Sequence, residues 1–215
     1  MVPVHTRTLV AVADITNAEF FERHAAPGRV GLVGGPALLD RLIQRAQRKQ
    51  RDDRSWSPWA HAFVFQGRRF DGHHWLLESN IEFHRENVQI GVQECRVAKY
   101  FDDEAITSCA VLDFGLDEAS VGKILGTGLD LLAGRTQYSL REILSVYVRL
   151  RDPATRNRRS RLAQDRAMFC SAFVQHVYLA AGIDFADDVD TKLTTPEDIA
   201  QTRVPHTAFM IARAT

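Results

Sequence analysis

The sequence predicts a single α+β domain in which an antiparallel sheet packs against helices. Three observations predict this class: four strand-like segments follow one another in the middle of the chain, helical patterns flank them, and neither an internal repeat nor a low-complexity linker divides the 215 residues. Regular βαβ alternation, which would indicate a parallel sheet, is missing. We therefore expect one domain over residues 1–215, with residues 1–27 as an N-terminal elaboration.

The composition is that of an ordinary globular protein. Hydrophobic residues make up 45% of the chain, which is enough for a buried core. Lys plus Arg and Asp plus Glu each total 27, so the formal net charge is zero and no whole-chain field favours nucleic acid or an anionic membrane. Any charged partner must therefore be bound locally.

The cysteine content and the N-terminal sequence indicate in which cellular compartment the protein is expected. Cys95, Cys109 and Cys170 are too few, and odd in number, for a disulfide framework, and no pair has the close spacing of a zinc knuckle. No stretch has the charge and length of a signal peptide, and none approaches membrane-spanning length. We expect a cytoplasmic protein without an integral membrane segment, unless a cleaved leader precedes this sequence.

The N-terminal third predicts short elements. Asn17 is a candidate cap for a brief helix over residues 18–26, and residues 30–33 read as a short strand. Gly34-Gly35-Pro36 opens a second helix, whose basic C-terminal end suits the helix dipole. Its apolar residues fall at helical spacing: Leu38, Leu39, Leu42, Ile43 and Ala46.

The middle of the chain predicts a meandering antiparallel sheet, because short apolar segments alternate with turn residues. The expected strands are residues 60–67, 73–83, 88–97 and 105–114. Helices are expected after them, at residues 116–133, 139–150 and 168–181. A short helix beginning near Thr195-Pro196-Glu197 then leads into an apolar strand, residues 207–213.

Cys170 is the candidate nucleophile. It lies in the first turn of the most apolar helical pattern, AMFCSAFVQHVYLAAG, which ends at Gly182. The unpaired backbone N–H groups and the dipole at such a position favour a thiolate and lower the cysteine pKa. The preceding segment, residues 151–166, holds six arginines against two aspartates, which acts in the same direction. The alternative is a buried cysteine that packs as a small hydrophobe.

A thiol nucleophile needs a base, and the base needs an orienting partner. If residues 67–72 connect the first two strands of the sheet, His61 lies opposite Glu78 on the same face. The carboxylate would then accept from one ring nitrogen while the other faces the thiol. A slip of two residues keeps the face, with Asn80 as a substitute for Glu78. Without the cysteine, such a pair is ordinarily a surface salt bridge.

The order of these segments resembles that of a known family. His61 in WSPWAHAFVF, Glu78 in WLLESNIEF and Cys170 in MFCSAFVQHVYLAAGIDF are similar in order to the circularly permuted NlpC-type papain-like enzymes, the YiiX-like group related to the lecithin retinol acyltransferase family. The resemblance spans roughly residues 28–185.

The segment around Cys170 resembles the family pattern at some positions and departs from it at others. The family often has Tyr-Cys-Ser-Glu-Leu-Val around its cysteine. Here the stretch is Phe169-Cys170-Ser171-Ala172-Phe173-Val174, which keeps Cys-Ser and the apolar helix. Ala172 stands in place of the glutamate, and Phe169 in place of the tyrosine.

The resemblance implies a permuted papain-like fold, with an antiparallel sheet or barrel packed against helices and the nucleophile on a C-terminal helix. It implies a thiolate nucleophile that acts on amide, ester or thioester carbonyls. We expect a thiol hydrolase that cleaves an amide bond, peptide or cell-wall-type, through an acyl-enzyme, and we expect no cofactor. Cys170 would be the nucleophile, His61 the general base and Glu78 the third polar residue. The Cys170 backbone N–H and one further donor would form the oxyanion hole.

Four residues are candidates for substrate binding. Trp56 and Trp59 flank the approach to His61, where they either wall an apolar or sugar-binding groove or anchor the hairpin in the core. Tyr138 lies where the family tends to have an aromatic residue before its C-terminal helices. Ser171 directly follows the nucleophile. The expected substrate is a peptide, an amide or a small acyl ester.

Three alternatives stay open. The same three residues would serve an acyltransferase or a lipid (thio)esterase, and a silent module of the same fold would bind a lipid, peptide or glycan. A metal-dependent hydrolase would use His61, Glu78 and a turn histidine. His73 and His74 point to opposite faces of a strand, so at most one of them can join, and we expect no metal. The arginine-rich segment lacks aromatic residues for base stacking, so we expect no nucleic-acid partner.

Overall fold

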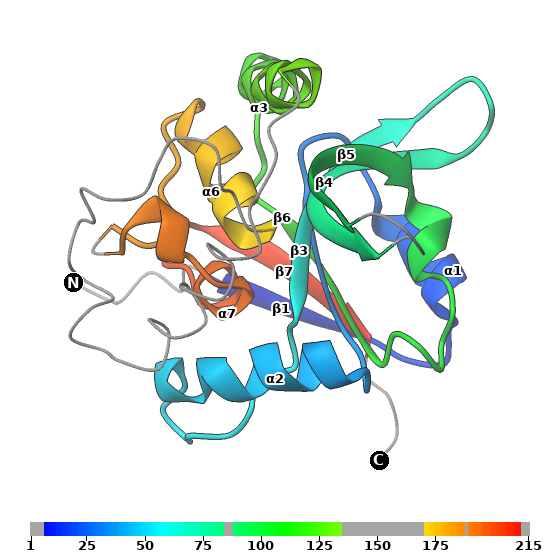
Figure 1. Ribbon diagram of the computed structural model, residues 1–215. Coiled ribbons are helices and arrows are strands. Elements are labelled where there is room, and N and C mark those ends of the chain that lie inside the picture. The colour runs from blue at the N-terminus through cyan, green and yellow to red at the C-terminus, as the bar shows by residue number, and fades with distance from the viewer. Residues whose placement is uncertain (1–6, 84–87, 135–169, 188, 212–215) are drawn as a thin grey trace.

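The computed structural model describes residues 7–83, 88–134, 170–187 and 189–211. Helices lie around one seven-stranded sheet (Figure 1), which confirms the predicted α+β class. The strands are β1 (Arg7–Val12), β2 (Val30–Gly34), β3 (His61–Arg68), β4 (His74–Phe83), β5 (Val88–Arg96), β6 (Ser108–Asp113) and β7 (His206–Ile211). The α-helices are α1 (Asn17–His24), α2 (Leu38–Ala46), α3 (Glu118–Ala133), α6 (Cys170–Leu179) and α7 (Pro196–Ala200). Within these ranges the short 3-10 helices are η1 (Gln47–Gln50), η2 (Val97–Tyr100) and η3 (Thr191–Leu193).

The sheet is mixed, with the strand order β1-β7-β6-β2-β3-β4-β5. β3, β4 and β5 form the predicted antiparallel meander, but β6 pairs with β2 and not with β5. β1 lies parallel to β7 at one edge, and the sequence did not predict it as a strand. The full meander was wrong because consecutive strands are neighbours only as a tendency, and the return of β6 to β2 has no local signal.

Both faces of the sheet are buried. Alternate residues of β3 point to opposite sides, so Val64 packs in a cluster with Phe173 of α6, whereas Phe63 packs in a second cluster with Phe21 of α1. The rings of Phe21 and Phe63 are 6.3 Å apart. Because Phe20 and Phe21 are fully buried, helix α1 belongs to the core, whereas most residues of β1 are exposed.

The helix termini follow local chemistry. α1 begins after Thr16, whose side chain accepts from the backbone N–H of Glu19 in a capping box. The predicted cap, Asn17, is instead the first helical residue, and its buried amide donates to the backbone carbonyl of Ile106. The helix predicted at residues 139–150 lies outside the described residues. Among the residues that are described, no helix is long and apolar enough to cross a membrane.

Candidate active site

The β3–β4 hairpin carries His61 and Glu78, in a register two residues from the predicted one. Glu78 lies opposite Phe63, not His61. The connection begins later in the chain than expected, at residue 69, and the pairing shifts again between Phe65 and Gly67, as at a β-bulge. Gly67 has φ of 105°, which favours glycine. A strand register counted from the predicted turn takes neither the later turn nor the bulge into account.

His61 and Glu78 nevertheless contact each other. A slip of two residues keeps both side chains on one face, and the His61 Nε2 atom lies 2.8 Å from Glu78 Oε2. His61 is the first residue of β3, so the contact runs diagonally across the hairpin. Glu78 is fully buried, which distinguishes this pair from a surface salt bridge.

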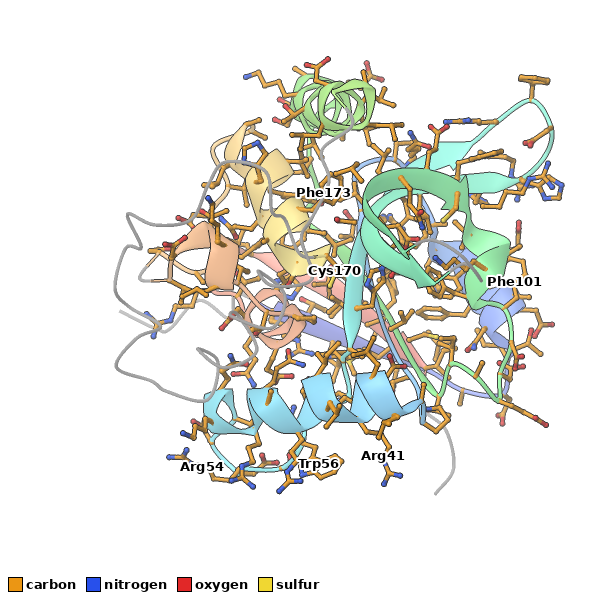
Figure 2. The ribbon with its side chains drawn as sticks, in the orientation of Figure 1. Arg41, Arg54, Trp56, Phe101, Cys170 and Phe173 are labelled. Carbon is orange, nitrogen blue, oxygen red and sulfur yellow. The ribbon has the colours of Figure 1, made fainter. Side chains whose placement is uncertain are left out.

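Cys170 is the first residue of α6, and its thiol lies beside the ring of His61, which lowers the pKa of the thiol through its charge and hydrogen bonding. Because Nε2 of that ring contacts Glu78, Nδ1 is the nitrogen that faces the sulfur. Hydrogen bonding from the backbone N–H groups of Ala62 and Ser171 also lowers the pKa of the thiol. Figure 2 shows Cys170 at the end of α6 that meets β3. The structure thus brings the three predicted residues together.

The charges of the site follow from these contacts. Burial raises the pKa of the Cys170 thiol, but the charge and hydrogen bond of His61 and the two backbone donors outweigh it, so the net shift is downward. Burial likewise disfavours a charged imidazole, yet Cys170 and Glu78 raise the pKa of His61 to about 10. Both shifts favour the thiolate–imidazolium form of the pair, the form in which a cysteine is nucleophilic.

Glu78 accepts hydrogen bonds from several side chains that were not predicted from the sequence. Lys99 Nζ lies 2.6 Å and Gln93 Nε2 lies 2.7 Å from its Oε1 atom, and the Tyr100 hydroxyl donates to Oε2. Burial raises the pKa of Glu78, but His61 and Lys99 hold it well below its usual range. Glu78 is therefore a carboxylate throughout the range in which His61 titrates.

The sequence offers little indication that the partners of Glu78, namely Gln93, Lys99 and Tyr100, belong to the site. Gln93 lies on β5 next to Glu78 in the β4–β5 register, and the other two belong to η2, which directly follows β5. Correct pairing of the second and third meander strands would have placed Gln93 opposite Glu78. Asn80, the predicted substitute, donates to Glu78 at 3.5 Å, so it supports the carboxylate that contacts His61.

Aromatic packing holds Tyr100 in place. Its ring stacks on Phe63, with the centroids 4.8 Å apart and the planes 5° from parallel. Phe63 in turn lies against Gly31 of β2, where an added Cβ would be 2.2 Å from the phenyl ring. The absence of a side chain at Gly31 thus makes room for the ring that supports Tyr100.

Replacing Gly31 by alanine is expected to lower the free energy of unfolding by about 1–3 kcal/mol, because the new methyl group overlaps a buried ring. Urea unfolding measures this change. Gly122→Ala on α3 is the matched control: nothing lies within 4 Å of its new Cβ, so it should keep or raise stability. Equal stability of the Gly31 variant and the wild type would contradict the packing argument.

The candidate substrate-binding residues lie elsewhere or serve the fold. Trp59 is 4% exposed and packs in the core cluster of α6, so it anchors the core and walls no groove. Trp56 is 43% exposed beside α2. The Ser171 hydroxyl is buried and donates to the backbone carbonyl of Thr194 at 2.7 Å, a contact that fixes the start of α6. Tyr138 lies outside the described residues.

A metal site built on His61, Glu78 and a turn histidine finds no support in the described part of the chain. His74 lies near the turn, where its Nε2 atom is 3.7 Å from Glu22. His73 is exposed. No group of three or more His, Cys, Asp and Glu side chains among the described residues is arranged to hold an ion.

The fold and the site define an α+β protein with a thiol, an imidazole and a buried carboxylate in contact. No protein-family model and no curated protein matches the chain. Among solved structures, the fold is similar to the crystal structure of the metalloprotein YiiX from Escherichia coli O157:H7, with a TM-score of 0.57 and 12% sequence identity. The match covers 89% of this chain and 98% of that one. At this identity the likeness shows a YiiX-like fold and nothing of the chemistry.

Proposed function

We propose that the protein is a cysteine hydrolase of the permuted papain-like type, which cleaves an amide bond through an acyl-enzyme. One observation carries the proposal: the His61 ring is hydrogen-bonded to the buried Glu78 carboxylate and also lies beside the Cys170 thiol, whose pKa it lowers. This is the arrangement of nucleophile, base and orienting group that acyl transfer requires. The resemblance of the three sequence segments to permuted papain-like enzymes supports the same assignment.

In the proposed reaction, the Cys170 thiolate attacks the carbonyl carbon and a C–S bond forms. The Cys170 backbone N–H, at the start of α6, stabilises the developing oxyanion. The His61 imidazolium gives its proton to the leaving amine, and the C–N bond breaks. Neutral His61 then takes a proton from water, whose oxygen attacks the thioester and releases the acid and the thiolate. Glu78 stays ionised and keeps the ring oriented.

YiiX is described as a metalloprotein. The described side chains of this protein do not fit a bound ion, because no group of three or more His, Cys, Asp and Glu residues among them is arranged to hold one, and Glu78 is already hydrogen-bonded to His61 and to Lys99. The proposed mechanism therefore has no step that involves a metal.

Alkylation tests the charge state on which the mechanism depends. Cys170 is expected to react with iodoacetamide at pH 6 at least about tenfold faster than free cysteine, because its pKa is lowered by His61 and the backbone donors. The rate should fall only when the pH drops below that lowered pKa. Mass spectrometry assigns the modified residue, with Cys170→Ser as the control.

Two outcomes are distinguishable in that experiment. Loss of the fast phase in Cys170→Ser, with Cys95 and Cys109 reacting slowly, supports the thiolate. A rate at Cys170 equal to that of free cysteine at every pH would contradict the ion pair and the proposed function with it.

A further inference from the structure

Helix α2 presents an apolar face to solvent. None of its nine residues is buried, and Leu38, Leu39 and Leu42 are 77%, 49% and 38% exposed. Trp56, which follows η1 in the chain, is exposed on the same side. In Figure 2, Trp56 and Arg41 lie on the outer side of α2 and point away from the rest of the protein. The sequence places these leucines at helical spacing, but the described part of the fold leaves them exposed.

Basic side chains surround these apolar residues. The Arg41 and Arg45 guanidinium carbons lie 5.9 and 6.0 Å from the centroid of the Trp56 ring, so two cations flank the exposed indole. Residues 38–56 contain three aspartates against six basic residues, whereas the whole chain has 27 charges of each sign. The basic residues are Arg41, Arg45, Arg48, Lys49, Arg51 and Arg54.

We call the exposed set Leu38, Leu39, Arg41, Leu42, Arg45 and Trp56 the α2 face. Leucines, an amphipathic tryptophan and arginines on one helix are the composition of helices that lie in a lipid interface. On such a surface the leucine side chains and the indole would contact acyl chains instead of water, while the arginine side chains would extend to the lipid phosphates. Both requirements are met on this one surface.

Two other occupants fit the α2 face less well. A second copy in a two-fold dimer would bring the same cluster of cations against itself, and like charges across an interface repel. Residues 151–166 of the same chain carry six arginines and two aspartates, so their charge has the same sign as that of the face. An anionic bilayer complements both the charge and the apolar residues.

We propose that the α2 face docks the protein on an anionic lipid bilayer. Asp40, on the same helix, is partly buried, whereas the residues of the α2 face are exposed. The inference goes beyond the proposed hydrolase function and does not depend on it.

Vesicle sedimentation with the full chain tests this proposal. The protein is expected to bind vesicles of phosphatidylcholine with about 30% phosphatidylglycerol, and to bind pure phosphatidylcholine much more weakly. Arg41→Gln with Arg45→Gln should weaken binding about 30-fold, roughly fivefold per charge. Leu38→Ser with Leu42→Ser should weaken it at least about tenfold through lost apolar burial. Both pairs are exposed, so the fold should persist, and circular dichroism checks that it does.

Matched controls lie on other helices. Arg23 on α1 and Leu129 on α3 are also exposed, so Arg23→Gln and Leu129→Ser should leave binding unchanged. Cys170→Ala should bind vesicles like the wild type, which separates docking from catalysis. Equal binding to both vesicle types, no binding, or equal weakening by the controls would overturn the proposal. A dimer that forms without vesicles and is lost in the Leu38/Leu42 variant would assign the face to a second copy instead.

Discussion

Replacing Glu78 by glutamine is expected to lower the free energy of unfolding by about 3–5 kcal/mol at neutral pH, the usual cost of removing one partner of a buried ion pair. The carboxylate is fully buried and accepts from Lys99, Gln93 and Tyr100 as well as from His61. A glutamine amide would turn a donor toward groups that also donate, and it would leave Lys99 without its anion. Urea unfolding measures the loss.

The pH dependence of this loss has a defined sign. The folded-state pKa of Glu78 lies below its ordinary value of 4.5, so the stabilisation is fully present above pH 4.5 and is lost as the pH falls through the folded-state pKa. The difference between wild type and Glu78→Gln should therefore shrink in acid, and it should shrink again as the pH rises through about 10, where His61 loses the proton that pairs it with Glu78. Glu22→Gln is the control, because its exposed pair with Arg68 should contribute less than about 1 kcal/mol. A loss of that small size at Glu78 would contradict the buried network.

Replacing His61 by alanine is expected to lower kcat/KM for an amide or activated acyl ester by about 10²- to 10⁴-fold, the range of a general acid–base residue. The variant loses the proton donor to the leaving group and the cation that holds Cys170 as a thiolate. The fold should persist, since Glu78 keeps Lys99, Gln93 and Tyr100 as donors. Steady-state rates measure the effect, and alkylation of Cys170 at pH 6 should slow in parallel.

His73→Ala is the matched control for that substitution, because this exposed histidine lies at the turn of the same hairpin. It should leave the rate unchanged. A Cys170→Ala baseline subtracts hydrolysis that does not use the thiol. Full activity in His61→Ala, measured above that baseline, would rule out the proposed roles of His61.

The elements of the fold were predictable from local patterns, whereas their order in the sheet was not. Alternation and turn residues placed β3 to β6 to within a few residues, because side-chain period and turn chemistry are local properties. The pairing of β6 with β2 and of β1 with β7 joins segments distant in the chain, and no composition signal marks such contacts.

The part of the site that depends only on which face of a strand a residue occupies was predictable. His61 and Glu78 met despite a wrong register, because a slip of two residues preserves the face. Gln93 and Tyr100 lie 15 and 22 residues beyond Glu78, and no spacing rule ties them to it. The different burial of Trp56 and Trp59 depends on tertiary packing, which a tryptophan count does not show.

The charges of the site alternate in sign along a row of neighbouring side chains, from Cys170 through His61 and Glu78 to Lys99. The net charge of these four side chains is zero when the thiol is ionised. Lys99 is the most exposed of the four, Cys170 and His61 are partly exposed and Glu78 is buried, so dissolved salt screens mainly the Lys99 end. A nucleophile built this way needs no counter-ion from solvent to remain charged. Ionic strength should therefore act on the α2 face far more than on the reactive sulfur.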